Sequence, residues 1–150
     1  MSRERAALGA LAMAGFVVTG AAVEWVSTDG RLALDAWIDL VAGWVLAGAG
    51  IAAWLSAPRS RIGPLLMAAA AAWFLGTLIS VTSPIGRTEP GRLAWFLIQC
   101  HAGFLVQAIA TWPSGRITRP TQLVVVVGGW IAALFPQLWV DSPGYIVLGV

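Results

Sequence analysis

Residues Trp37–Ser56 read WIDLVAGWVLAGAGIAAWLS, a stretch of 20 residues in which Asp39 is the only charged side chain. An α-helix rises about 1.5 Å per residue, so about 20 apolar residues cross the roughly 30 Å hydrocarbon core of a bilayer. Backbone amides inside lipid have no water to bond, and helical hydrogen bonds satisfy them there. The stretch therefore predicts a membrane-spanning helix.

Further runs of similar length and apolarity lie on either side of it, and short loops between the runs carry nearly all the charge. These runs are Ala6–Val26, Pro64–Thr82, Leu93–Trp112 and Gln122–Val140. Charged residues make up only 11% of the 150-residue chain, against about 25% in an ordinary soluble domain, and the mean hydropathy is +0.81. We expect an all-α fold, a polytopic membrane helix bundle of five transmembrane helices that forms a single domain over residues 1–150.

Each end of the chain leaves an alternative open. The basic start resembles the n-region of a signal peptide, but the apolar run behind it exceeds the about 7–15 residues of a signal h-region. A retained helix is therefore favoured over cleavage after Ala22. At the other end, Asp141–Tyr145 is a turn signal and Ile146–Val150 begins another apolar run. We interpret residues 141–150 as an outer turn and the start of a sixth span of a longer protein, with a short outer tail as the alternative.

The arginines are distributed unevenly between the two sets of loops. If sides are counted alternately, the N-terminal side holds Arg3, Arg5, Arg59, Arg61, Arg116 and Arg119, and the opposite side holds Arg31, Arg87 and Arg92. Basic loops are retained in the cytoplasm, so the pattern predicts a multi-pass protein of the plasma membrane with a cytoplasmic N-terminus. Six arginines less Glu4 leave +5 inside, and three arginines less the other six carboxylates leave −3 outside.

Tryptophans and small residues follow patterns that are typical of membrane helices. An aromatic belt at the headgroup level explains the tryptophans near helix ends, which are Trp25, Trp37, Trp54, Trp95, Trp112 and Trp139. The deeper Trp44, Trp73 and Trp130 are interpreted as packing residues or lipid-facing bulk. Small side chains at helical spacing predict close helix contacts and are compatible with a homodimer. They are Gly43, Ala47 and Gly50; Ala69, Ala72, Gly76 and Ser80; and Gly129 and Ala133.

His101 is the most unusual polar residue because it lies near the centre of a predicted span. Ionisable groups at that depth are costly and are candidates for a function, so we take His101, Gln99 and Gln107 as candidates for ligand binding or sensing. At about 100° per residue, His101 lies about 200° from Gln99 and about 120° from Gln107. The three side chains therefore do not converge on one ligand from this helix alone. A neutral imidazole hydrogen-bonded to a neighbouring helix is the simpler explanation.

Carboxylates around the first outer hairpin form a second candidate group, which comprises Glu24, Asp29, Asp35 and Asp39. They could attract cations or cationic peptides, although solvation of an outer loop explains them more simply. The chain carries no phosphate-binding glycine loop, no H-E-x-x-H and no nucleophile elbow, which speaks against an enzyme. Because Cys100 and the single histidine lack a third ligand nearby, no metal and no cofactor are expected. Scattered arginines and a net charge of +2 speak against nucleic acid as a partner.

The sequences of two predicted inner loops resemble a known group of proteins. Residues 58–66 read PRSRIGPLL and run into AWFLG at residues 72–76, and His101 is followed ten residues later by TWPSGR at residues 111–116. These motifs resemble the N-terminal membrane region of actinobacterial two-component sensor histidine kinases. In that group, a PxxRxGxLL…AWFLG stretch precedes a helix that bears a His and ends in a YPSGR-like turn. The match covers residues 57–119 and departs from the pattern at Trp112, where the group often has Tyr.

The inner-loop residues that match are Arg59, Arg61, Gly63, Pro64, Pro113, Ser114, Gly115 and Arg116. They also have an ordinary physical explanation. Pro64 suits a helix start, Pro113 ends the preceding helix, Gly115 permits a turn, and Arg116 reaches the anionic inner leaflet.

The resemblance implies a membrane-embedded sensory or input region, in which a change in helix packing is passed through a last helix to a cytoplasmic kinase. A response regulator would be a partner only through that kinase, whose phospho-accepting helix and ATP-binding domain are absent from these 150 residues. Five spans and the start of a sixth agree with a cytoplasmic kinase, which requires an even number of spans. A small standalone polytopic membrane protein, as an accessory or structural subunit, is the alternative. A transporter fragment is the weakest reading, because no inverted repeat or broken helix is evident.

Overall fold

The described part of the chain is built from α-helices alone. The computed structural model describes the backbone of residues 3–27, 34–82 and 89–135, with the side chains of residues 3–26, 34, 36–78 and 96–135. Within these ranges there are five helices and no strand, namely α1 (Arg3–Ser27), α2 (Leu34–Ser56), α3 (Ile62–Thr82), α4 (Glu89–Ala110) and α5 (Pro120–Leu134). The predicted all-α class is confirmed. Asp29 and the predicted sixth span lie outside the described residues.

The predicted spans and the helices agree to within a few residues at most boundaries. α1 begins three residues before the predicted run, and α2 and α5 also begin slightly earlier. α5 ends at Leu134, and residues 136–140 of its predicted continuation lie outside the described residues. α4 begins at Glu89, four residues before the predicted run, and it stops at Ala110, two residues short of that run, because residues 111–116 fold into a turn. Trp112 was therefore wrongly included in the fourth span. The apolarity of Thr111 and Trp112 extended the predicted run, although the chain already turns ahead of Pro113, as the restriction on residues before proline would favour.

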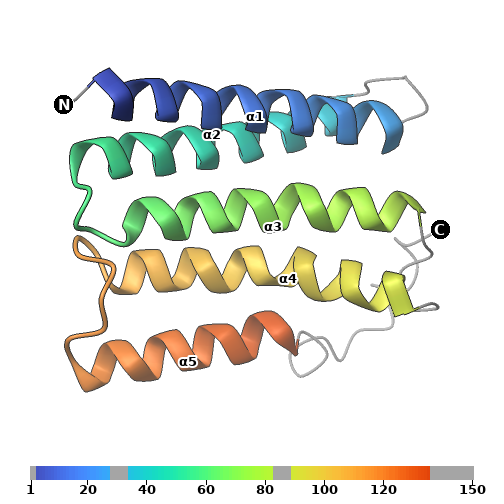
Figure 1. Cartoon of the computed structure of the whole chain (residues 1–150). Helices are drawn as coiled ribbons and strands as arrows, with labels where there is room; N and C mark the ends of the chain where they lie inside the picture. The colour runs from blue at the N-terminus through green and yellow to red at the C-terminus, as the bar shows by residue number, and fades with distance from the viewer. Residues whose placement is uncertain (1–2, 28–33, 83–88, 136–150) are drawn as a thin grey trace.

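Successive helices run antiparallel and lie side by side (Figure 1). α1, α2 and α3 each contact the other two, whereas α4 contacts α3 and α5, and α5 contacts only α4 within the described residues. The arrangement is thus a cluster of three helices extended by a row of two, and these helices do not close around one common core. The N-terminal end of α1, the α2–α3 loop and the α4–α5 loop all lie at the same end of the molecule (Figure 1).

Two glycine contacts bring the first three helices close together. A Cβ on Gly50 would lie 2.9 Å from the carbonyl oxygen of Gly63, and a Cβ on Gly63 would lie 2.7 Å from the carbonyl oxygen of Gly50. α2 and the start of α3 therefore meet backbone against backbone. Gly20 of α1 and Gly43 of α2 leave space for the buried ring of Phe74, which lies within 2.9 Å of the Cβ position at both glycines.

The small-residue faces also form the contacts of the outer row. Ala69 of α3 is fully buried, and a Cβ on Gly76 would overlap Ile98 of α4 at 2.5 Å. A Cβ on Gly129 of α5 would overlap Val106 of α4 at 2.4 Å. The predicted use of small residues for close packing is confirmed at these positions, since a methyl group at either glycine would force the helices apart.

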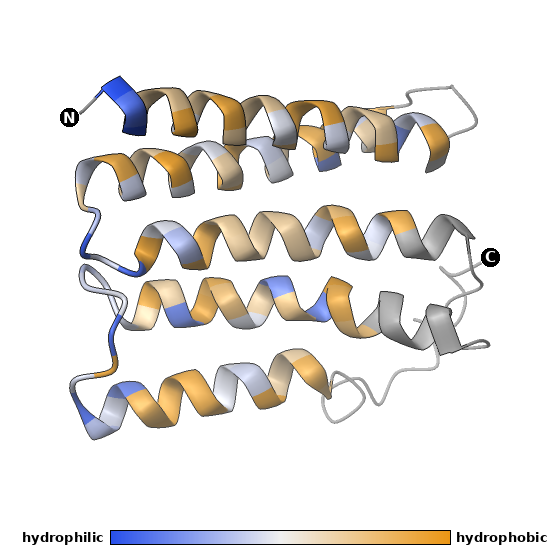
Figure 2. Cartoon of the chain, in the orientation of Figure 1, coloured by the Kyte–Doolittle hydropathy of each residue, from blue (hydrophilic) through white to orange (hydrophobic). Residues whose placement is uncertain are grey.

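Two helices are long and apolar enough to cross a membrane, over Arg3–Val26 and Ala36–Ser56. The remaining helices contain shorter apolar segments within the described residues, over Ile62–Leu78, Phe96–Ala110 and Pro120–Leu134. Figure 2 shows that hydrophobic residues cover most of each helix, while hydrophilic residues gather at the end that holds the N-terminus and the α2–α3 and α4–α5 loops.

Candidate functional site

The two loops that carry the inner-loop motifs bind each other directly. The Arg61 amide donates a hydrogen bond to the Ser114 carbonyl at 2.9 Å, and the Ser60 hydroxyl donates to the Pro113 carbonyl at 2.7 Å. The Ser60 hydroxyl also accepts a hydrogen bond from the Ile62 amide at 3.2 Å, at the first turn of α3. We call residues 58–63 and 111–116 with these bonds the loop junction. It ties the α2–α3 connection to the α4–α5 connection.

Gly115 is required at the loop junction for two reasons. Its φ of 70° lies in the left-handed region, which residues with a Cβ adopt at a cost. A Cβ there would also lie 2.7 Å from the backbone of Arg61 and Ile62. The predicted turn at Gly115 is confirmed, and the close approach of the second loop is a constraint that the sequence alone does not reveal.

The Gln122 side chain also holds the α4–α5 loop in place. Its side-chain oxygen accepts hydrogen bonds from the Thr118 amide at 2.9 Å and the Arg119 amide at 3.1 Å, and its nitrogen donates to the Ala110 carbonyl at 3.0 Å. Gln122 thus connects the start of α5 to the end of α4. This role of Gln122 is not among the predictions from the sequence, although a Gln three residues after a helix N-cap is half of a capping-box pattern.

His101 packs against α3. Its ring meets the Trp73 ring edge to face, with 4.6 Å between ring centroids and an interplanar angle of 80°. Its Nδ1 is hydrogen-bonded to the Ile98 carbonyl of its own helix. A carbonyl only accepts, so Nδ1 donates this hydrogen bond. We predicted a hydrogen bond from His101 to a neighbouring helix. Among the described residues, His101 instead contacts the neighbouring helix α3 through the Trp73 ring.

Gln107 faces α5. The Trp130 indole nitrogen donates to the Gln107 side-chain oxygen at 3.2 Å, and the Trp130 ring also packs edge to face on Phe104 at 4.9 Å. His101 and Gln107 therefore contact different neighbouring helices, as their helical angles predict. Gln99 is half-buried and is not joined to either of them by a hydrogen bond. The three residues do not form one site.

Glu24 is buried near the C-terminal end of α1, with only 3% of its surface exposed. Solvation in an outer loop, the simpler explanation drawn from the sequence, is therefore wrong for this carboxylate. Asp39 of α2 is half-buried. Asp29 and the side chain of Asp35 lie outside the part of the chain that the structure describes. Of the predicted acidic group, the structure therefore describes the side chains of Glu24 and Asp39. Within the described ranges, no three His, Cys, Asp or Glu side chains lie close enough to hold a metal ion.

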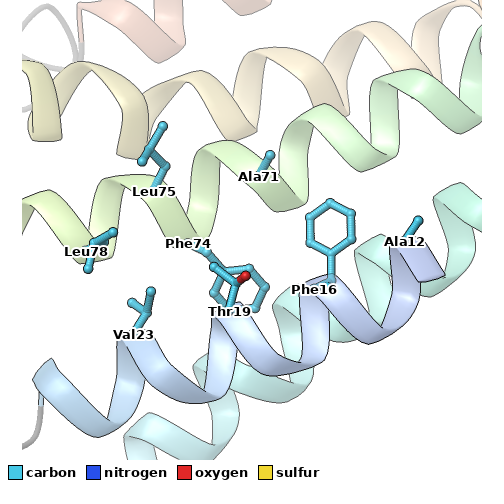
Figure 3. A pocket seen from close by; sticks show the side chains of 9 residues that line it. Ala12, Phe16, Thr19, Val23, Ala71, Phe74, Leu75 and Leu78 are labelled. Atoms are coloured by element: carbon cyan, nitrogen blue, oxygen red, sulfur yellow. The ribbon is translucent and has the colours of Figure 1, made fainter.

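An apolar groove of about 410 Å³ runs between α1 and α3. Figure 3 shows Phe16 and Val23 projecting from α1 towards α3, with Phe74 and Leu78 on the α3 side. Among the described residues that line the groove, Thr19 alone has a polar side chain. The groove therefore suits an apolar occupant.

Comparison of the chain with protein-family models, with curated proteins and with solved structures finds no match.

Proposed function

We propose that the chain is a multi-pass membrane protein with five spans and a cytoplasmic N-terminus, and that it acts as a sensory input region. Its closest functional analogy is the membrane region of actinobacterial two-component sensor histidine kinases. The proposal has two parts, the membrane location and the signalling role, and different observations support them.

The apolar exterior supports the membrane location. In the apolar 18-residue stretch of each helix, only 17% of the residues of α1 and 28% of those of α2 are buried inside the fold. A core helix of a soluble protein is mostly buried. Large apolar side chains point outwards on three helices, with exposures of 69% for Leu11, 62% for Val45 and 70% for Val124. Soluble monomers rarely expose contiguous apolar surface on this scale. Lipid as the surrounding solvent accounts for it.

Helix length and tryptophan position agree with the same location. α3 contains 21 residues, which at about 1.5 Å per residue gives roughly 32 Å, close to the thickness of the hydrocarbon core. Trp25, Trp37 and Trp112 lie near helix ends and are 58%, 47% and 68% exposed. Amphipathic rings at these positions suit the headgroup region.

The loop junction is the observation that carries the signalling role. The two motifs behind the family resemblance lie in separate loops, and the hydrogen bonds of Ser60 and Arg61 join them. A shift of α3 against α4 at the level of His101 and Trp73 would therefore be passed to both loops together. Such a two-state repacking, biased by a ligand, by lipid or by charge at the outer face, is how an input region would act.

The coding frame beyond residue 150 tests this role. We expect an apolar run that returns the chain to the cytoplasm, followed by a helix with a phospho-accepting His and an ATP-binding domain. An in-frame stop at that point, together with a stable folded product of 150 residues, would overturn the signalling role. That outcome would favour a standalone accessory or structural subunit.

A further inference from the structure

An open hollow of about 500 Å³ lies between the first turns of α1 and the α2–α3 loop. Arg5 lines it from α1, and Ala57, Pro58 and Arg59 line it from the loop. Both arginines are exposed, so their guanidinium groups can reach a ligand from the surrounding medium. Pro58 and Arg59 belong to the loop junction, but its hydrogen bonds run through the neighbouring Ser60 and Arg61.

The hollow lies at the positively charged end of the molecule. The end of the molecule that holds it carries six arginines, and Glu4 is the only carboxylate of α1's first turns and of the two loops, which leaves six minus one, or +5. Two arginines on separate elements suit a phosphate, because each guanidinium offers a fork of N–H donors to its oxygens.

Apolar residues follow Arg5 on the same face of α1, beyond Gly9, which packs against Leu55 of α2. Ala12 and Phe16 lie seven and eleven residues after Arg5, a spacing that keeps residues on one helix face. Both residues line the near part of the groove between α1 and α3 (Figure 3). A molecule held at Arg5 by an anionic group therefore has an apolar path beneath it, which suits a phospholipid better than a free anion.

From this geometry we infer that Arg5 and Arg59 bind the phosphate of an anionic phospholipid of the cytoplasmic leaflet. The inference rests on the membrane location proposed above. The bound lipid bridges α1 and the α2–α3 loop, and its acyl chain lies against the Arg5 face of α1. A guanidinium that donates hydrogen bonds to the phosphate at this site contributes about tenfold in affinity, so loss of both weakens binding by about 100-fold.

The test uses the full chain reconstituted in vesicles of phosphatidylcholine, with and without phosphatidylglycerol. Native mass spectrometry after mild detergent extraction measures the retained phosphatidylglycerol across a titration. The double variant Arg5→Gln with Arg59→Gln is compared with the matched double variant Arg3→Gln with Arg119→Gln. Each pair removes one arginine from the start of α1 and one from a loop at the same end, but only the first pair lines the hollow.

We expect one retained phosphatidylglycerol for the unaltered chain and for the matched variant, and an affinity about 100-fold lower for the Arg5 and Arg59 variant. An equal loss in both variants would show diffuse attraction to the leaflet and overturn the site, as would the absence of any retained lipid. Inorganic phosphate that competes at millimolar concentration would show a simple anion site instead of a lipid site. Flotation of the vesicles tests the membrane location separately. A chain that does not float with the vesicles contradicts the membrane location, whereas a chain that floats but retains no lipid contradicts only the lipid site.

Discussion

At the scale of single residues, substitutions at the contact between His101 and Trp73 can distinguish a packing role of His101 from a chemical role. An edge-to-face ring pair contributes about 0.5–1.5 kcal/mol beyond the burial of its area. We expect His101→Ala to lower the thermal unfolding midpoint in detergent, because the Trp73 ring loses its partner across the α3–α4 interface. His101→Phe should recover most of the loss, since it restores an aromatic edge. If both variants are equally destabilised, the imidazole nitrogens matter, and a sensing role gains support.

Gly115 offers a second test at this scale, with a matched glycine in a helix. Gly115→Ala places a Cβ 2.7 Å from the Arg61 backbone at a φ of 70°, so we expect a loss of about 2 kcal/mol or more in the free energy of unfolding. Gly128→Ala meets no atom within 4 Å and should be neutral or stabilising by up to about 1 kcal/mol. Unfolding followed by circular dichroism compares the two. Similar stabilities for the two variants would contradict the close approach of the loops.

The structural role of a residue could be predicted from the sequence where that role depends only on the backbone close to it in the chain. The turn at Gly115 depends on the backbone of the same loop, and the sequence predicted it correctly. Gly63 was expected only as part of a helix start, yet it also allows the backbone of α3 to touch that of α2 at Gly50. The burial of Glu24 was not predicted either. Both depend on which helices are neighbours, and hydropathy carries no information about that.

At the scale of elements, the loop junction makes the two inner loops one unit. The Ser60 hydroxyl makes two hydrogen bonds of the loop junction. It donates one to the Pro113 carbonyl and accepts one from the Ile62 amide. Its replacement by alanine should cost about 1 kcal/mol and should expose the α4–α5 loop to trypsin at Arg116. Ser56→Ala, at the exposed end of α2, is the matched variant and should leave the cleavage rate unchanged. Equal cleavage in both would mean that the junction does not hold the loop in solution.

The helices themselves were the most predictable elements, because twenty apolar residues in a row admit only one backbone state in lipid. Their contacts were only partly predictable. The faces with small residues correctly indicated close packing, but not that Gly20 and Gly43 together receive the ring of Phe74. A large side chain that fills a gap between two glycines on different helices is a property of three elements at once. It becomes visible only when their positions are known.

At the scale of the whole molecule, the described helices form an open row that ends at α5. α5 contacts α4 alone among the described helices, and Val124 and Val125 on it are 70% and 52% exposed. Short connections make consecutive helices neighbours, which the sequence could predict. Whether the last helix returns to the first is decided by side-chain fit over the entire chain, and the same five hydropathy peaks would serve a closed bundle or a row.

The sidedness of the molecule is the property on which the lipid site and the signalling role both depend, and the single native cysteine makes it measurable. Cys100 is buried in α4, so Cys100→Ala provides a background without thiols. Thr121→Cys then places a thiol at the exposed start of α5, and Val26→Cys places one at the exposed far end of α1. Because six of the nine arginines lie at the end that holds Thr121, that end should be cytoplasmic. A membrane-impermeant maleimide added to intact cells should label the Val26→Cys variant at once and the Thr121→Cys variant only after permeabilisation. The reverse pattern would place the arginines outside, where they could neither meet the anionic inner leaflet nor pass a signal to a cytoplasmic kinase.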